Sequence, residues 1–230
     1  MKLLLLPGLD GTGTLFDRLI GCLPENLSAV AVAYPPSLGA FDDYVSFVSQ
    51  YIVNVGESMV LVAESFSGPI AVEVLRNPPD NLKGVVLVAT FMQSPSPRLL
   101  ALAGRLPHWL MRALVGLALD SFCLNGNADD IAAKRIKDVV QSLSPELIKA
   151  RLGILQSLPV DLPSLLTAGK LPLLFIKPLR DRLVARKYFS QIEQRLPGDC
   201  IASIDGPHFL LQCRPSQCAD AIAAFIKRCV

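Results

Sequence analysis

The sequence is poor in metal-binding and redox side chains. Its 230 residues include two histidines and six cysteines, and no two cysteines form a C-x-x-C pair. Zinc sites and redox dithiols usually show such pairs, or cysteine and histidine clusters at short spacing. We therefore expect no metal centre, and we interpret the cysteines as small, mostly buried side chains in a reducing compartment.

An excess of one charge sign is also missing. The chain has 22 lysines and arginines against 20 aspartates and glutamates, and the charges are scattered along it. Nucleic-acid binding usually needs a basic patch or stripe, so we expect no nucleic-acid partner. Hydrophobic residues make up 51% of the sequence, which excludes a disordered chain and allows one sizeable core.

Long hydrophobic runs are absent as well. The opening MKLLLLPG has only four leucines before Pro7 and Gly8, which is shorter than the apolar part of a signal peptide. Residues 99–119 are strongly apolar, but they are interrupted by Arg105, Pro107, His108 and Arg112. This pattern disfavours a membrane span. We therefore expect a cytoplasmic protein without stable membrane insertion.

Short apolar runs that end in turn signals are what the sequence does contain. Such runs are typical of strands buried on both faces of a parallel sheet. They are Lys2–Leu6, Ala29–Tyr34, Met59–Ala63, Gly84–Thr90, Leu171–Ile176 and Cys200–Ile204. Helical periodicity appears between them, in Asp42–Val55, Pro69–Arg76 and Ser216–Lys227. This alternation predicts an α/β fold: a mostly parallel central sheet of about six strands, flanked by helices.

Residues 92–168 break this alternation. They contain no convincing strand, and their helical patterns are Arg98–Leu119, Ala128–Leu143 and Pro145–Leu158. We interpret the segment as a helical lid inserted into a core formed by residues 1–91 and 169–230. One face of its first pattern is apolar, and we place Trp109 and Leu110 from this pattern in a substrate pocket. Ordinary core packing of an amphipathic helix is the alternative.

A serine lies at a turn between a predicted strand and a predicted helix. Ala63–Gly68 reads AESFSG and directly follows the apolar run at 59–63. A strand, a sharp turn with serine at its apex and then a helix form a nucleophile elbow, whose usual pattern is G-x-S-x-G. Ala63 and Ser67 replace the glycines, and both are small enough for a tight turn. Ser65 is therefore the candidate nucleophile, Ser67 is its rival, and an ordinary helix N-cap is the alternative.

A glycine-rich segment follows the first predicted strand. It reads PGLDGTG, with glycines at positions 8, 11 and 13. Neither a P-loop nor the dinucleotide-binding G-x-G-x-x-G is present. Such a turn can aim one backbone N–H at an oxyanion, together with the N–H that follows a nucleophile. We identify Leu9 and Phe66 as the candidate donors.

A histidine and an aspartate also follow predicted strands. His208 lies between the last strand and the last helix, and Asp181 follows the strand at 171–176. A carboxylate in that place can accept the histidine Nδ1–H and fix its tautomer. Asp205 is the rival acid, but it is too near His208 in sequence to support it easily. The alternatives are a packed or surface histidine and an aspartate that only pairs with a neighbouring arginine.

The order serine, aspartate, histidine, each after a strand, is that of the α/β-hydrolases. Over nearly its whole length the chain resembles a compact member of that family. LLPGLDGTG resembles the oxyanion loop, AESFSG the elbow, KPLRDRLV the acid turn and GPHFLLQ the histidine loop. The layout is similar to small bacterial carboxylesterases, including the pimeloyl-ester type, and PGLDGTG resembles the loop of phytyl-ester-synthase-like acyltransferases. The sequence departs from the family at the elbow glycines and at Pro178, where the family often has glycine.

The resemblance implies a serine hydrolase with Ser65 as nucleophile, His208 as general base and Asp181 as the orienting acid. Its expected substrate is a small-molecule ester with a small to medium acyl chain, and the chemistry requires no metal or organic cofactor. An acyl thioesterase or acyltransferase would use the same triad, and a thioesterase could take an acyl carrier protein as partner. A non-catalytic ligand-binding member of the fold is a further alternative.

Overall fold

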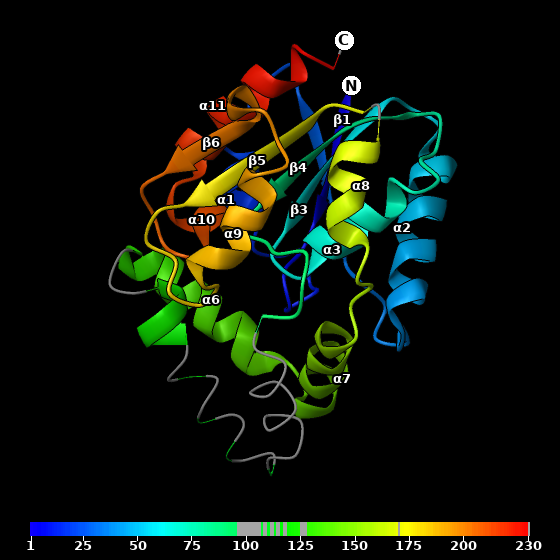
Figure 1. Ribbon diagram of the computed structural model, residues 1–230. Coiled ribbons are helices and arrows are strands. Elements are labelled where there is room, and N and C mark those ends of the chain that lie inside the picture. The colour runs from blue at the N-terminus through cyan, green and yellow to red at the C-terminus, as the bar shows by residue number, and fades with distance from the viewer. Residues whose placement is uncertain are drawn as a thin grey trace.

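The computed structural model describes residues 1–95, 107, 110, 113, 116, 119–124, 128–169 and 171–229. One sheet of six parallel strands forms its centre, in the order β2-β1-β3-β4-β5-β6 (Figure 1). The strands are β1 (Lys2–Leu6), β2 (Ser28–Ala31), β3 (Met59–Glu64), β4 (Leu82–Val88), β5 (Leu173–Pro178) and β6 (Ile201–Ile204). The predicted α/β architecture is confirmed, and each predicted strand is present with boundaries shifted by up to three residues.

Helices cover both faces of the sheet. On one face lie α2 (Phe41–Val55), α3 (Ser67–Val74), α8 (Leu162–Ala168) and α9 (Arg186–Glu193). On the other face lie α1 (Asp17–Ile20), α10 (Leu210–Cys213) and α11 (Pro215–Ile226). The strands supply alternate residues to the two layers: Leu4 and Leu6 face the first, and Leu3 and Leu5 face the second. This double burial is the reason that the strands read as continuous apolar runs.

The strand order creates a crevice next to β1. From β1 the chain crosses to β2 at one edge of the sheet, then returns to β3 on the opposite side of β1. In open parallel sheets, ligands bind beyond the carboxyl ends of the strands at such a reversal. Leu6 pairs in register with Ala63, so the loops that follow β1 and β3 begin at the same level.

The described parts of the chain between β4 and β5 contain helices and no strand. They include a turn of π-helix, η1 (Leu119–Leu124), followed by α6 (Asp130–Ser142), α7 (Pro145–Gln156) and α8. Figure 1 shows α6 and α7 beyond the carboxyl ends of the strands. In contrast, α8 packs into the same apolar layer as α3, although it falls within the predicted lid. Most of the predicted helix Arg98–Leu119 lies outside the described residues.

Four of the helices that cover the sheet, α1, α8, α9 and α10, and the 3₁₀ turn η2 (Gly198–Cys200) were not predicted as separate elements. All are short, at eight residues or fewer, and so carry little periodic signal.

Within the described ranges, no helix combines the length and the apolar character that crossing a bilayer requires.

Candidate active site

Ser65 occupies the apex of a strained turn between β3 and α3. Its φ of 48° lies in the left-handed region, which costs a non-glycine residue about 1–3 kcal/mol. Three hydrogen bonds hold this backbone: Ser65 N–H donates to Val88 O (2.9 Å), and Ser65 O accepts from Gly68 N–H (3.1 Å) and from Thr90 Oγ1 (2.6 Å). The surrounding structure therefore fixes the turn, as the predicted elbow requires.

The rival serine, Ser67, is engaged in structural hydrogen bonds. Its side chain is fully buried, and its hydroxyl donates to the carbonyl oxygen of Pro7. Because the Ser67 proton is used there, the Tyr34 hydroxyl is the donor in the 2.7 Å contact between the two side chains. Ser67 thus links the elbow to the ends of β1 and β2.

The structure brings Ser65, His208 and Asp181 into one hydrogen-bonded series. His208 Nε2 lies 2.9 Å from Ser65 Oγ, and His208 Nδ1 lies 2.7 Å from Asp181 Oδ2. The side chains of His208 and Asp181 are 5% and 1% exposed. An ionised Asp181 can only accept at Nδ1, so that nitrogen carries the proton and Nε2 is left to accept from Ser65.

The surroundings of His208 favour its charged form. Burial alone lowers the pKa of His208, but the charge and hydrogen bond of Asp181 and the charge of Glu64 outweigh burial. The pKa of His208 therefore lies above its ordinary value. Asp181 is itself held in place, because its Oδ1 accepts from the N–H groups of Leu183 (2.8 Å) and Val184 (2.9 Å).

The loops that carry Asp181 and His208 are bound to each other. Arg180 N–H donates to Gly206 O (3.0 Å), and Leu179 N–H donates to Ile204 O (2.9 Å). Asp205, the rival acid, forms an ion pair with Arg180 at 2.5 Å and is about half exposed. Its carboxylate therefore connects the two loops, while the carboxylate of Asp181 contacts the histidine.

The two backbone N–H groups predicted to bind an oxyanion belong to residues at the cavity. Leu9 and Phe66 both line the cavity beside Ser65. Among the described residues, none accepts a hydrogen bond from the N–H of either. Gly8 O accepts from Gly11 N–H (3.1 Å). The N–H and C=O of a trans peptide point in opposite directions, so this bond turns the Leu9 N–H away from Gly11.

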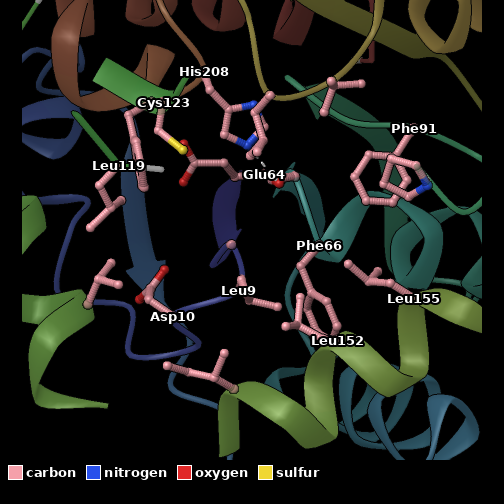
Figure 2. A pocket seen from close by; sticks show the side chains of 18 of the residues that line it. Leu9, Asp10, Glu64, Phe66, Phe91, Leu119, Cys123, Leu152, Leu155 and His208 are labelled. Carbon is pink, nitrogen blue, oxygen red and sulfur yellow. Dashed lines mark hydrogen bonds between the residues drawn. The ribbon is translucent and has the colours of Figure 1, made fainter. Parts of the chain in front are cut away.

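A cavity of about 260 Å³ opens beside Ser65 and His208. In Figure 2, Phe66, Leu152 and Leu155 lie on one side of it, and Leu119 and Cys123 lie on the other. Several lining residues come from η1, from α6 and the residue that caps it, and from α7: Leu119, Cys123, Val140, Leu143, Ile148, Leu152 and Leu155. Of the two predicted pocket residues, Leu110 is half-buried and does not line this cavity, and Trp109 lies outside the described residues. The insertion contributes to the cavity through different residues.

Two buried carboxyl groups interrupt the apolar lining. Asp10 is 6% exposed, and its Oδ2 accepts from the backbone and the hydroxyl of Thr12. Glu64 is 3% exposed and lies close to His208 in Figure 2. Its Oε2 accepts from Gln212 Nε2 (3.1 Å), while its Oε1 has no partner in the part of the chain that is described.

The environment of Glu64 changes its titration. Burial raises the pKa of Glu64 to about 7, against the opposing effect of the Gln212 hydrogen bond. The charge of Asp10 raises this pKa further, and His208 lowers it. Glu64 had no predicted role of its own. The available signal was an acidic side chain at the end of an otherwise apolar strand.

Cys123 is the one cysteine among the described residues that line the cavity, and it is a free thiol. Burial raises the pKa of Cys123 to about 12, and the charge of Asp181 adds to this effect. Since the thiolate is the nucleophilic form of cysteine, this shift disfavours Cys123 as a nucleophile. No group of three or more potential metal ligands comes together within the described ranges.

No family model and no curated protein sequence matches the chain. Solved structures do resemble it. An esterase from Exiguobacterium antarcticum has a TM-score of 0.81 at 13% identity, covering 99% of this chain and 92% of that one. A thermophilic esterase from Thermogutta terrifontis has a TM-score of 0.82 at 17% identity, covering 100% and 90%. A bromoperoxidase from Bacillus anthracis has a TM-score of 0.76 at 15% identity, covering 98% and 91%. These similarities establish the α/β-hydrolase fold.

Proposed function

We propose that the protein is a serine hydrolase that cleaves carboxylic esters with small to medium acyl chains. The observation that carries the proposal is the series Ser65 Oγ–His208 Nε2 at 2.9 Å and His208 Nδ1–Asp181 Oδ2 at 2.7 Å, on the wall of a largely apolar cavity. The esterases that share the fold support the proposal.

Acylation follows from this geometry. His208 Nε2 takes the hydroxyl proton as Ser65 Oγ bonds to the ester carbonyl carbon, and Asp181 stabilises the resulting imidazolium. The carbonyl oxygen becomes an oxyanion, to which the N–H groups of Leu9 and Phe66 donate. When the intermediate collapses, the bond to the alcohol oxygen breaks and His208 gives its proton to that oxygen. The products are a free alcohol and an acyl ester of Ser65.

Deacylation repeats these steps with water. His208 takes one proton from a water molecule as the water oxygen bonds to the acyl carbon. The Leu9 and Phe66 N–H groups bind the second oxyanion. The bond to Ser65 Oγ then breaks, and Ser65 receives the proton from His208. The carboxylic acid leaves and the free enzyme is restored.

The cavity supports an acyl substrate of limited size. Its volume of about 260 Å³ lies just below the range for small-molecule sites, which is roughly 300–1,000 Å³. Apolar side chains of α6 and α7 form part of its wall, against which an apolar acyl chain can pack. We therefore propose that α6 and α7 act as the lid over the acyl group.

A series of p-nitrophenyl esters from acetate to decanoate tests the proposal. We expect the wild type to hydrolyse the shorter members, to be labelled by a fluorophosphonate probe at Ser65, and to lose both properties on Ser65→Ala substitution. A binding protein without catalytic activity would neither hydrolyse the esters nor be labelled by the probe, and that result would refute the proposal. Thioesters of matched chain length, free and on an acyl carrier protein, establish whether oxygen or sulfur is the preferred leaving group.

A further inference from the structure

Arg151 is the largest fully buried side chain in the described part of the protein. It lies on α7 and is 1% exposed. Ile148 and Leu155, three residues before it and four after it, are buried on the same helix. The spacing places Arg151 on the apolar face of α7, where a charged residue is costly unless it has partners.

The partners of Arg151 belong to the loop after β1. Its Nη1 donates to the carbonyl oxygens of Leu9 (2.9 Å) and Asp10 (2.5 Å). Its Nε donates to the hydroxyl of Tyr44 on α2 (3.2 Å). A helix of the insertion therefore holds two successive peptide groups of the segment that carries the Leu9 N–H.

Gly11 shows how closely this loop follows the guanidinium. Its φ is 66°, and a Cβ added there would lie 2.3 Å from both Nη atoms of Arg151. No side chain fits in that space while Arg151 occupies it. The glycine is thus required both by the backbone conformation and by the arginine.

We propose that Arg151 is a positioning residue for the oxyanion site. By binding the Leu9 and Asp10 carbonyl oxygens it fixes the peptides on the carboxyl side of Leu9, while the bond from Gly11 N–H to Gly8 O fixes the peptide before it. The Leu9 N–H is then held toward the cavity from both directions. The inference rests on the proposed hydrolase function.

A purely structural role of Arg151 would show as a loss of folded protein, with kcat per active site unchanged. Removing one partner from a buried hydrogen-bonded group leaves the other partners unsatisfied, so some loss of stability is expected with either role. Arg151→Met is therefore the informative variant, because it keeps the buried volume and removes every hydrogen bond to the loop. Arg151→Lys keeps a charge but has no planar group that can bind two carbonyl oxygens in the same geometry.

Arg135 on α6 offers a matched control. It also connects the insertion to the core, since its Nη2 donates to Thr14 O (3.2 Å) and to Asp17 (2.9 Å). It makes no contact with Leu9 or Asp10. Arg135→Met therefore removes an insertion-to-core contact without affecting the peptides that flank the Leu9 N–H.

The experiment compares the wild type and these variants in kcat, KM and the Ki of an alkyl boronic acid. A boronic acid bonds to the serine oxygen and places a negative oxygen in the oxyanion site. Fluorophosphonate titration supplies the concentration of active sites, so that loss of folded protein does not alter kcat or Ki. For Arg151→Met we expect kcat to fall about 10- to 100-fold and Ki to rise by a similar factor, with KM within about threefold. We expect Arg135→Met to change neither value more than about twofold.

An Arg151→Met variant that titrates fully and matches Arg135→Met in kcat and Ki would overturn the proposal. If Arg151→Met does not fold, Arg151→Lys and Tyr44→Phe decide, since they weaken the same contacts less severely. Both should then lower kcat and raise Ki together, and unchanged values in both would equally overturn it. A wild type with no esterase activity would instead contradict the proposed function, so the two failures are distinguishable.

Discussion

Glu64→Gln should make the protein more stable at neutral and alkaline pH. The Glu64 carboxyl is 3% exposed, its Oε1 has no partner among the described residues, and its pKa is raised by burial to about 7. The substitution keeps the size of the side chain and can keep the hydrogen bond to Gln212. It removes the ionised form, which is the form that burial opposes.

The size and direction of the effect follow from the two pKa values. Below about pH 4.5 the carboxyl is protonated in both the folded and the unfolded chain. As the pH rises the unfolded chain ionises first, which favours unfolding, and above about pH 7 the folded protein carries the full cost. The pKa of Glu64 rises from 4.5 in the unfolded chain to about 7 in the folded protein. This difference corresponds to about 3 kcal/mol of stability lost with rising pH.

Urea unfolding of the wild type and of Glu64→Gln, followed by circular dichroism from pH 5 to pH 8.5, measures this effect. The free energy of unfolding of the variant minus that of the wild type should grow by about 2–3 kcal/mol over that range and level off above pH 7. Glu57→Gln is the control, because the Glu57 side chain is 62% exposed and pairs only with Lys2 in the described structure. The free energy of unfolding of Glu57→Gln minus that of the wild type should change by no more than about 0.5 kcal/mol over the same pH range. A Glu64 difference that is independent of pH would refute the reasoning.

Three further predictions concern catalysis. The kcat/KM of the wild type should rise with pH through an inflection above the ordinary pKa of histidine, because His208 must be neutral to act as a base. Glu64→Gln should move that inflection to lower pH, because the charge of Glu64 raises the pKa of His208. In initial-rate assays, Asp181→Asn should lower kcat about 10⁴-fold, whereas Asp205→Asn should change it less than about tenfold; the reverse ranking would refute the assignment. Across the ester series, kcat/KM should rise up to about fourfold per added methylene, and Leu152→Ala should flatten that trend without changing acetate turnover. Unchanged chain-length selectivity in this variant would mean that other residues determine the preference for acyl chain length.

The sequence was sufficient to predict the sheet and the series of three side chains. Ser65, Asp181 and His208 each follow an apolar run, and the carboxyl ends of parallel strands meet at one edge of a sheet. Strand-end position alone therefore predicted that these distant residues come together, and in the structure their side chains are in hydrogen-bond contact. Strand boundaries were less predictable, because hydrogen-bond pairing continues past the apolar run in β5, which ends at Pro178.

The cavity wall could not be derived in the same way. Amphipathic periodicity identifies an apolar face but does not specify which residues of that face meet a ligand and which meet another helix. The prediction chose Trp109, which lies outside the described residues, and Leu110, whereas Leu152 and Leu155 on α7 line the cavity. The role of Arg151 was not predicted, because a charged residue within an apolar stripe does not fit the periodic pattern and is left out of the predicted buried face. Its partners are backbone carbonyl oxygens, which have no sequence signature.

The elbow explains why two glycines of the usual pattern are dispensable. Among the residues around the turn, Ser65 alone has a positive φ, so Ala63 and Ser67 need only be small. Ala63 is fully buried, and the hydroxyl of Ser67 gains a bond to the loop after β1 that glycine could not form. Gly68 is different, because a Cβ there would lie 1.9 Å from Thr90 Oγ1, and Thr90 is the residue that holds the Ser65 carbonyl. The steric requirement of the turn is therefore met one position beyond the place where the motif expects glycine.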